Sequence, residues 1–528
     1  MGSSSANDPT SGGTTSLWMG TFDMPTFPPL NRDLTVDVCV VGAGIAGLST
    51  AYMLARDGKK VAVLDDGPIG GGESGRTTAH LSWAMDEGID LLERVHGAQD
   101  TRLVVESHRA AVDRIERIVH DERIECHFRR VDGYLFLGGD VKPEFLDQEL
   151  AAAHRAGDKD VTRVERPPIP GRDVGPALRW PRQGQFHVLE YLAGLVRAIG
   201  EKGGEIFCGT HVSSVSGTKP GHPCRVETEN GKVVTAQAVC VCTNASITDM
   251  VRTHTKQAPY RTFAIAAVIP RGSVTPALFW DTEDPYHYVR TQPLDEPEPG
   301  ALGGDGPYEA LIVGGEDYKT AHEDDAEERW RALERWMRER WPAAREVVYR
   351  WSGQVLEPND YLAFIGRNPD GAKNVYMASG DSGQGMTHGT IAGMLLGDLV
   401  QGRPNPWEKI YDPHRISLSP QPLKEFAKEN ADVAMHFVKD YLTPDRISEE
   451  EIPRGEGRVV RHGLHKLAVY RDESGALHHR SAVCTHMKCI VDWNTAEKSW
   501  DCPCHGSRFD PYGTVLNGPA VSDLPPVE

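Results

Sequence analysis

The sequence has fewer basic residues than acidic ones and contains no long basic run. Its 57 lysines and arginines stand against 76 aspartates and glutamates, which gives a formal net charge of -19 at pH 7. A chain of this charge repels the phosphates of nucleic acids and of anionic membrane surfaces. We therefore expect no nucleic-acid partner.

Long apolar runs are also missing. No stretch approaches the roughly 20 apolar residues that a membrane-spanning helix needs. The Ser/Gly/Thr-rich start has neither the basic segment nor the apolar core of a secretory signal. We predict a cytoplasmic protein with no membrane span and with a flexible tail over residues 1–34. A chain of 528 residues, 39% of them hydrophobic, is long enough for two or three domains.

Cysteine is scarce and unevenly distributed. Four of the ten cysteines fall between residues 484 and 504, and the other six are scattered through the chain before them. Scattered cysteines suit a reduced interior, whereas a cluster suits a metal. Cys240 and Cys242 have a C-x-C spacing that could bind metal, but they lie in an apolar run, and we interpret them as small core residues.

Residues 36–66 have the pattern of a βαβ unit, with two apolar runs flanking a glycine turn and a helix of period 3.6. Gly42, Gly44 and Gly47 form G-x-G-x-x-G at the strand-to-helix turn, where backbone amides can approach a pyrophosphate. Asp65 ends the second strand, where a carboxylate can bind ribose hydroxyls. The nearby "GGGESG" matches the same pattern without a suitable helix behind it, so we predict dinucleotide binding by the first copy.

No second complete fingerprint occurs between residues 130 and 350, whereas reductases that take hydride from NAD(P)H through a flavin usually carry one. One nucleotide site is therefore expected. From residue 374 the sequence gives another strand, a turn at Gly380, Gly383 and Gly385, and a helix. This second unit can close over the far end of a long cofactor, which suits FAD better than NAD.

The sequence resembles the FAD-dependent oxidoreductases of the D-amino-acid oxidase and glycine oxidase superfamily over residues 35–405. The resemblance rests on "VVGAGIAGLSTAYMLARDG", "GESGRTTAHLS", "GTHVSSV" leading to "AVCVCTNA", and "VYMASGDSGQGMTHGTIAG". It implies an α/β fold in which a Rossmann-like FAD-binding domain carries an α+β substrate domain. The FAD-binding segments would be 35–84, 181–254 and 351–415, and the substrate domain would be 85–180 and 255–350.

The resemblance also implies the cofactor contacts. The ADP half of the cofactor would contact the glycine turn and Asp65, and the backbone of Val212 would contact the adenine. The flavin would lie between two further segments. The implied residues are Gly42, Gly44, Gly47, Asp65, Arg76, Thr77, Thr78, Val212, Gly383, Gly385, Met386 and Thr387.

The same resemblance places a sheet from the second insertion over the flavin, and it implies an amine or amino acid as substrate. Arg290 would then hold a carboxylate and Tyr288 would wall the site, although period-2 alternation turns half of such residues away from it. His80 and His388 flank the flavin segments. Each is predicted either to act as an acid or base near neutral pH or to make an orienting hydrogen bond.

A linker is predicted over residues 416–447, before a new domain at 448–528. Apolar residues at helical spacing indicate an amphipathic helix docked on the main domain, and a proline ends it. These residues are Leu423, Phe426, Val433, Phe437, Tyr441 and Pro444. The last 80 or so residues have short strand-like runs and too few apolar residues for a large core, so a metal and a disulfide would help stabilise them.

The spacing Cys484-x-His486 and Cys502-x-x-His505 supplies two thiolates and two imidazoles from two loops. A structural zinc site accepts such a set, but its ligands usually follow C-x2–4-C or H-x3–5-H. A Rieske [2Fe–2S] centre needs two cysteines on one iron and two histidines on the other, and this fits the spacing better.

"CTHMKC" and "CPCHGS" resemble the two boxes of the Rieske family, which implies a small all-β domain. By this resemblance Cys484 and Cys502 bind one iron and His486 and His505 bind the other. The remaining cysteines, Cys489 and Cys504, correspond to a pair that forms a disulfide in the respiratory-chain branch of the family. The spaced set of two histidines and a carboxylate that the oxygenase branch needs is missing from the sequence, so we expect no ring hydroxylation.

Three positions near the boxes bear on the reduction potential. Ser507 could donate a hydrogen bond to a bridging sulfide, which raises the potential. Phe509 stands where high-potential members carry a tyrosine hydroxyl, and Lys488 replaces the usual glycine. We predict a potential within the Rieske range of about -150 to +300 mV but below its upper end.

Together these features predict an FAD-dependent dehydrogenase that oxidises a C–N bond and passes electrons through the Rieske cluster to a one-electron acceptor protein or quinone. Two alternatives remain open at this point. A donor protein or quinol could reduce the cluster and drive electrons inward, or the terminal domain could be a structural or sensing unit on an oxidase.

Overall fold

The computed structural model describes residues 12–217, 222–248, 252–294, 307–369, 372–417, 419–442, 448–463 and 465–527, with the side chains of 432–442 outside this description. A mostly parallel sheet forms the base of the N-terminal part, in the order β16-β17-β10-β1-β2-β7, and β9 pairs with β10 and β8. These strands are β1 (Leu34–Val41), β2 (Val61–Leu64), β7 (Glu205–Phe207), β8 (Val212–Ser216), β9 (Cys224–Thr228), β10 (Val233–Val241), β16 (Phe364–Arg367) and β17 (Val375–Ser379).

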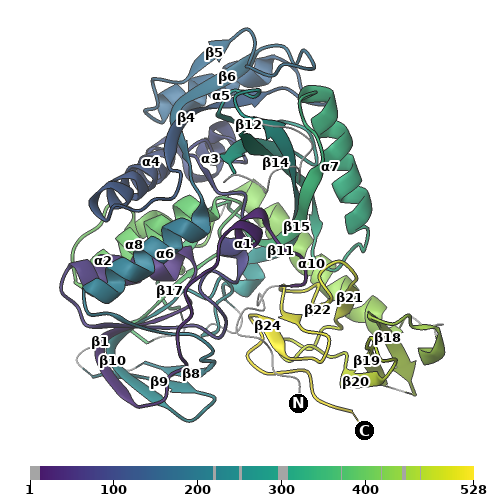
Figure 1. Ribbon diagram of the computed structural model, residues 1–528. Helices are drawn as coiled ribbons and strands as arrows, with labels where there is room; N and C mark the ends of the chain where they lie inside the picture. The colour runs from purple at the N-terminus through teal and green to yellow at the C-terminus, as the bar shows by residue number, and fades with distance from the viewer. Residues whose placement is uncertain are drawn as a thin grey trace.

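Both faces of this sheet are buried, which explains why β1 reads as an almost continuous apolar run. Val38 and Val40 point into the core under the helices, whereas Cys39 and Val41 point into a second core on the other face. Helices pack together on the first face, where α2 contacts both α6 and α8, and α4 contacts α8 (Figure 1). These helices are α2 (Ile45–Arg56), α4 (Ala98–Asp121), α6 (Val188–Glu201) and α8 (Gly385–Val400).

A second, mostly antiparallel sheet lies above the first in the order β15-β11-β14-β13-β12-β4-β6-β3, and β5 pairs with β6 (Figure 1). Its strands are β3 (His80–Leu81), β4 (Arg129–Phe136), β5 (Thr162–Val164), β6 (Ala177–Gln185), β11 (Gln257–Pro270), β12 (Ala277–Asp281), β13 (His287–Pro293), β14 (Tyr308–Lys319) and β15 (Val347–Pro358). Helix α7 (Ala326–Arg340) packs on β11 and β14, and α3 (Ile89–His96) and α5 (Glu144–Arg155) pack beside α4.

The C-terminal domain is built from two small antiparallel sheets, β18-β19-β20 and β21-β22-β23-β24. Its strands are β18 (Glu456–His462), β19 (His465–Arg471), β20 (Leu477–Ser481), β21 (Asp492–Asn494), β22 (Ser499–Asp501), β23 (Arg508–Phe509) and β24 (Val515–Asn517). Short helical turns complete the chain at η1 (Glu73–Gly75), η2 (His254–Lys256), η3 (Glu449–Glu451) and α9 (Glu408–Tyr411). The predicted fold class is confirmed, with an α/β part, a substrate sheet and an all-β terminal domain.

The flexible tail predicted over residues 1–34 is wrong from Gly12 onward. Helix α1 (Leu17–Thr21) places Leu17 and Trp18 fully inside the main core, and Leu30 is also fully buried. The Ser/Gly/Thr composition of the start hid these contacts, because they depend on partners far away in the sequence. Residues 1–11 lie outside the described part of the chain.

The linker helix is present as α10 (Pro420–Leu442), but Leu423 and Phe426 of its predicted apolar face are not docked. Leu423 is 47% exposed and Phe426 is 41% exposed. The helix is held instead by polar contacts: Glu429 pairs with Lys319 at 2.6 Å, and Asn430 donates to the Thr255 carbonyl at 3.1 Å. The side chains of Val433, Phe437 and Tyr441, and Pro444, fall outside the described residues.

Candidate active site and iron–sulfur site

A cavity of about 300 Å³ lies where the parallel sheet, the second sheet and the C-terminal domain meet. Most of the predicted cofactor residues line it, from the turn after β1 to the start of α8. These are Gly42, Gly44, Asp65, Arg76, Thr77, Thr78, Val212, Gly383, Gly385 and Met386. The structure therefore gathers residues that are more than 300 positions apart in the sequence around one elongated space.

The glycines of the first turn are required by close backbone approaches. Gly42 has φ +105°, and a Cβ atom there would lie 2.3 Å from the Cys242 carbonyl oxygen. Gly47 does not line the cavity; its Cβ would lie 1.9 Å from the Gly42 carbonyl oxygen, so glycine lets helix α2 pack on the turn. Gly44 begins α2 without a side-chain cap. The Ile45 amide donates to Ser74 Oγ at 3.0 Å, and this helix N-terminus lines the cavity, where it fits a pyrophosphate.

Asp65 closes the nucleotide end of the cavity. Its Oδ2 accepts a hydrogen bond from the Ala43 amide at 2.5 Å, and Oδ1 accepts one from the Gly67 amide at 2.8 Å. Burial, with the neighbouring Asp66, raises its pKa to about 7. A carboxylate buried beside the glycine turn is the group expected to receive ribose hydroxyls.

At the other end, α8 begins at Gly385 and points its N-terminus into the cavity. Thr387, predicted to face the flavin, does not line the cavity, because its hydroxyl bonds to His108 Nδ1 at 2.9 Å and to the Gln384 carbonyl at 3.1 Å. Gly385 and Met386 do line it. The amides at the start of α8 are therefore the donors available to a negatively charged ring at this end.

Tyr288 and His80 lie together on the wall formed by the second sheet. The Tyr288 hydroxyl bonds to Thr262 Oγ1 at 2.7 Å, and its ring meets the His80 ring edge-on at 5.6 Å. Burial, with help from the Arg290 charge, lowers the pKa of His80 to about 3. The pKa of His388 is also lowered by burial, to about 4, and its Nδ1 contacts the Asp381 carbonyl at 2.8 Å. Both histidines are neutral near pH 7, which favours the orienting role over the acid–base role.

Arg290 does not reach the cavity, so the structure does not support its predicted contact with a carboxylate. Its guanidinium is fully buried and donates to the carbonyls of Ala79 at 2.7 Å and Phe186 at 3.0 Å. Period-2 alternation identified β13 but could not tell which of its polar residues face the site. Residues that the sequence did not single out do line the cavity, among them Asp86 and Gln384. Asp86 lies in none of the quoted stretches, whereas Gln384 lies in the glycine-rich turn before α8.

The four predicted cluster ligands come together between the loops after β20 and β22. Cys484 and Cys502 hydrogen-bond to one another, and the rings of His486 and His505 lie 5.1 Å apart. All four side chains are buried. Two thiols and two imidazoles gathered in this way fit one iron on sulfur and one on nitrogen.

A disulfide joins Cys489 to Cys504, one from each box, with Cα atoms 6.5 Å apart. The pairing implied by the resemblance is confirmed. Lys488 adopts φ +66°, the left-handed conformation that glycine favours, which accounts for glycine being usual at this position. The described cysteines of the flavoprotein part, including Cys240 and Cys242, are buried and form no disulfide, in accord with the interpretation of Cys240 and Cys242 as core residues.

The surroundings of the sulfur ligands bear on the reduction potential. The Ser507 hydroxyl hydrogen-bonds to the Cys484 sulfur. Phe509 is fully buried on β23 and brings no hydroxyl. A potentiometric titration followed by electron paramagnetic resonance is therefore expected to give a value inside the range of about -150 to +300 mV and below its top. A value at the upper limit would contradict this prediction.

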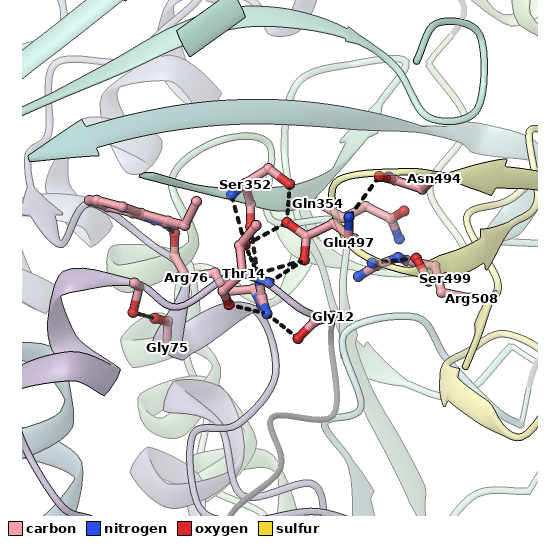
Figure 2. A network of polar contacts seen from close by, with 12 residues as sticks. Gly12, Thr14, Gly75, Arg76, Ser352, Gln354, Asn494, Glu497, Ser499 and Arg508 are labelled. Carbon is pink, nitrogen blue, oxygen red and sulfur yellow. Dashed lines mark hydrogen bonds and ion pairs between the residues drawn. The ribbon is translucent and has the colours of Figure 1, made fainter. Parts of the chain in front are cut away.

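A buried ion pair joins the flavoprotein part to the C-terminal domain (Figure 2). Arg76 Nη1 lies 3.1 Å from Glu497 Oε2, and neither side chain is exposed. Glu497 also accepts from Ser352 Oγ and Thr14 Oγ1, each at 2.6 Å. Burial alone would raise the pKa of Glu497, but Arg76 and two further arginines hold it at about 2. The Arg76 guanidinium, predicted to lie along the flavin, is thus engaged at the domain interface.

A second buried network lies next to the first. Asp501 receives Arg261 Nη2 of β11 at 2.9 Å and Arg508 Nε of its own domain at 3.0 Å. Arg508 and Arg261 hold the pKa of Asp501 at about 2 against the effect of burial. Each carboxylate is paired and hydrogen-bonded, which is the condition under which burial of charge is tolerated.

These two carboxylates predict how the interface responds to acid. A folded pKa of about 2 for Glu497 lies below the unfolded value of ~4.3, so its stabilising contribution is complete above ~pH 4.3 and is lost as pH falls through about 2. Asp501 acts with the same sign. We expect the unfolding temperature to fall between ~pH 4.5 and ~pH 2, and to fall less in Glu497→Gln. Thermal unfolding followed by flavin fluorescence measures both, and an equal fall in the variant would contradict the assignment.

The C-terminal domain also forms part of the cavity wall. Six of its residues line the cavity: Val515, Leu516, Asn517, Gly518, Ala520 and Val521. The Val521 carbonyl contacts His211 Nε2 at 3.3 Å, and Asn517 donates to Glu73 Oε1 at 3.4 Å. The nucleotide end of the cavity is therefore completed by the terminal domain.

The cluster loop itself touches this wall. Gln354 lines the cavity, and its Nε2 donates to the carbonyl of Gly506 at 2.9 Å. Gly506 belongs to the second box, where it follows the predicted ligand His505 and precedes Ser507. The His254 ring packs edge-on against His486, with centroids 5.1 Å apart. Gln354 thus contacts both the cavity and the ligand loop.

Comparison with known proteins agrees with both halves of this description. The family model "FAD dependent oxidoreductase" matches residues 37–399, and the model "Rieske [2Fe-2S] domain" matches residues 445–528. The chain therefore belongs to the family of FAD-dependent oxidoreductases and carries a terminal Rieske domain. The flavoprotein part binds FAD, and the terminal domain binds a [2Fe–2S] cluster.

Individual relatives share one or both parts. The chain is 30% identical over 513 residues to the Rieske 2Fe-2S iron-sulfur protein YhfW of Bacillus subtilis, covering 97% of each chain. It is 28% identical to gamma-glutamylputrescine oxidoreductase of Escherichia coli, over 71% of this chain and 86% of that one. Glycine oxidase from Geobacillus kaustophilus has the same fold, with TM-score 0.58 at 17% identity over 72% of this chain and 99% of that chain. Within the described residues, no helix is long and apolar enough to cross a membrane.

Proposed function

We propose that this protein is a dehydrogenase that oxidises a C–N bond of an amine or amino acid and passes the electrons from FAD to the Rieske cluster and on to a one-electron acceptor protein or quinone. The names of relatives support the substrate class. They identify gamma-glutamylputrescine for the Escherichia coli protein, glycine for the Geobacillus oxidase, and L-proline for a dehydrogenase of P. horikoshii with TM-score 0.57.

The observation that carries the relay is the contact between Gln354 and Gly506. Gln354 lines the cofactor cavity, and the Gly506 carbonyl belongs to the loop that bears Cys502 and His505. A terminal domain with only a structural role would not need its ligand loop to pack on the cavity wall. The buried pairs at Glu497 and Asp501 hold this contact in place.

The chemistry balances in two electrons. The substrate carbon gives up a hydride and its nitrogen a proton, so that a C–N single bond becomes C=N. A [2Fe–2S] cluster carries one electron at a time, so each turnover sends two electrons in succession to the acceptor, and two protons pass to solvent. FAD supplies the two-electron chemistry, and the chain supplies the enclosed site and the fixed approach of the ligand loop.

Stopped-flow mixing of the oxidised holoprotein with an amine that bleaches the flavin tests the relay. We expect flavin bleaching to be followed by loss of the oxidised cluster absorbance within the same turnover. Flavin reduction and reoxidation with no change in the cluster spectrum would overturn the proposal. Rapid cluster reduction by a ferredoxin or quinol, without amine oxidation, would show that electrons run inward instead.

A further inference from the structure

The end of the cavity next to the start of α8 contains a carboxylate that belongs to none of the sequence motifs. Asp86 lies between β3 and α3, and its Oδ1 accepts a hydrogen bond from Gln384 Nε2 at 2.6 Å. A Cβ atom at Gly383 would lie 2.3 Å from Asp86 Oδ2 and 3.8 Å from the Tyr286 hydroxyl. The glycine turn, Asp86 and Tyr286 are therefore in contact at one place, and all three line the cavity.

The Asp86 carboxylate is exposed to this internal space rather than hidden from it. Its side chain is accessible although protein surrounds it closely enough to raise its pKa to about 7, through burial and then through Glu87. Within the described residues, its one hydrogen-bond donor is the neutral amide of Gln384. Asp381 also lines the cavity, and burial raises its pKa to about 7 as well. Among the described residues, no lysine or arginine other than the engaged Arg76 lines the cavity to compensate negative charge here.

Among the described residues, free cationic side chains that could bind a carboxylate are missing from the same space. Of the lysines and arginines in the described part of the chain, Arg76 alone lines the cavity, and its guanidinium is paired with Glu497. The Arg290 guanidinium points away from the cavity and donates hydrogen bonds to backbone carbonyls. His80 and His388 are neutral near pH 7, with pKa values lowered to about 3 and 4. An α-amino acid would find no guanidinium to hold its carboxylate.

Aromatic rings stand beside the carboxylate. The rings of Tyr286 and Tyr288 lie 5.6 Å apart, and Trp280 also lines the cavity. A carboxylate next to aromatic faces is a favourable environment for an ammonium group, because both attract positive charge.

We propose that Asp86, with Tyr286 and Tyr288 beside it, binds an ammonium group of the substrate, so that the substrate is a diamine or polyamine rather than an α-amino acid. This inference rests on the proposed oxidation of a C–N bond. The nitrogen next to the oxidised carbon must be unprotonated when hydride leaves, so the charge that Asp86 holds belongs to a second amino group. Asp86 is thus a specificity-determining residue. The carbon that reacts lies at the other end of the substrate's carbon chain from the ammonium group that Asp86 binds.

A series of four-carbon compounds tests this with the FAD- and cluster-loaded protein. Under anaerobic conditions, 1,4-diaminobutane is expected to bleach the flavin more effectively than 1-aminobutane or 4-aminobutyrate. Asp86→Asn should weaken the apparent affinity for the diamine by about 10- to 100-fold and change that for the monoamine by no more than about two-fold, since only the diamine loses a charged contact. Asp86→Ser serves as a second variant if the amide repacks against Gln384.

Glu87→Gln is the matched control. It removes the same charge one residue away, from a side chain that does not line the cavity. A general field effect would weaken the diamine equally in both variants, whereas direct contact predicts a large effect at Asp86 alone. Equal weakening of diamine and monoamine by Asp86→Asn, or preferred reduction by the amino acid, would overturn the proposal.

Calorimetric titration of the oxidised holoprotein with 1,4-diaminobutane measures binding separately from turnover. Diamine binding that depends on Asp86, without flavin bleaching, would uphold the cation site and contradict the proposed oxidation. Flavin bleaching by amino acids alone, with no Asp86-dependent diamine binding, would do the reverse. The two proposals therefore fail in distinguishable ways.

Discussion

Replacing Cys484 with alanine is expected to stop electron delivery to a one-electron acceptor protein or quinone, while the amine still bleaches the flavin at a rate within a few-fold of wild type. Cys484 is predicted to bind the cluster, and none of the four predicted ligands lines the flavin cavity. The loss of a thiolate ligand removes the one-electron carrier and leaves the two-electron site intact. Acceptor reduction, iron content and anaerobic flavin bleaching measure the two halves separately.

Cys39→Ala is the matched control, because Cys39 is a fully buried free thiol on β1 in a core away from the cluster. It should keep the cluster and both rates. His486→Ala is a second variant that removes an imidazole ligand in place of a thiolate. If Cys484→Ala loses iron but still delivers electrons to the acceptor at the wild-type rate, the terminal domain is structural or sensory and the relay is wrong.

Glu497→Ala is expected to lower the free energy of unfolding by about 3–5 kcal/mol, the cost of leaving a buried charge unpaired. The carboxylate is fully buried against Arg76, Ser352 and Thr14, so its removal exposes donors on three sides to an empty space. The terminal domain should then separate more readily, and FAD should be released because residues 515–521 no longer cover its nucleotide end. Thermal unfolding and FAD retention on gel filtration measure the two effects.

The exposed pair Arg32–Glu205 offers a comparison for that experiment. Its side chains are 53% and 35% exposed, so Glu205→Ala should cost no more than about 1 kcal/mol. Glu497→Gln keeps the shape and removes the charge, and it should fall between the two. A stability loss at Glu497 no larger than that at Glu205 would show that the domains are held together elsewhere.

Sites whose residues lie close together in the sequence could be predicted from it. Gly42, Gly44 and Asp65 sit in one βαβ unit, and Cys484, His486, Cys502 and His505 sit in two short boxes, so their spacing alone placed them near one another. Local chemistry fixes such sites because the same few residues make the turn and bind the group.

Features that depend on distant partners could not be predicted. Asp86 and Gln384 meet across 298 positions, and Arg76 and Glu497 across 421, and no periodicity links them. Alternation along β13 located Arg290 on a strand but not the carbonyls that bind it. The helical spacing of Leu423 and Phe426 predicted a buried face, whereas the helix is held through Glu429 and Asn430.

Residues near the start of the described chain are bound by a residue near its end. The Gly13 amide donates to the Glu497 carbonyl at 2.8 Å, Thr14 bonds to the same side chain, and Arg76 Nη2 donates to the Gly12 carbonyl at 2.7 Å. During synthesis, Arg76 leaves the ribosome 421 residues before Glu497, and Thr14 leaves it 483 residues before the same partner. The flavoprotein core must therefore wait with a buried arginine unmatched until Glu497 emerges, so that this part of the core is completed only when the terminal domain has been made.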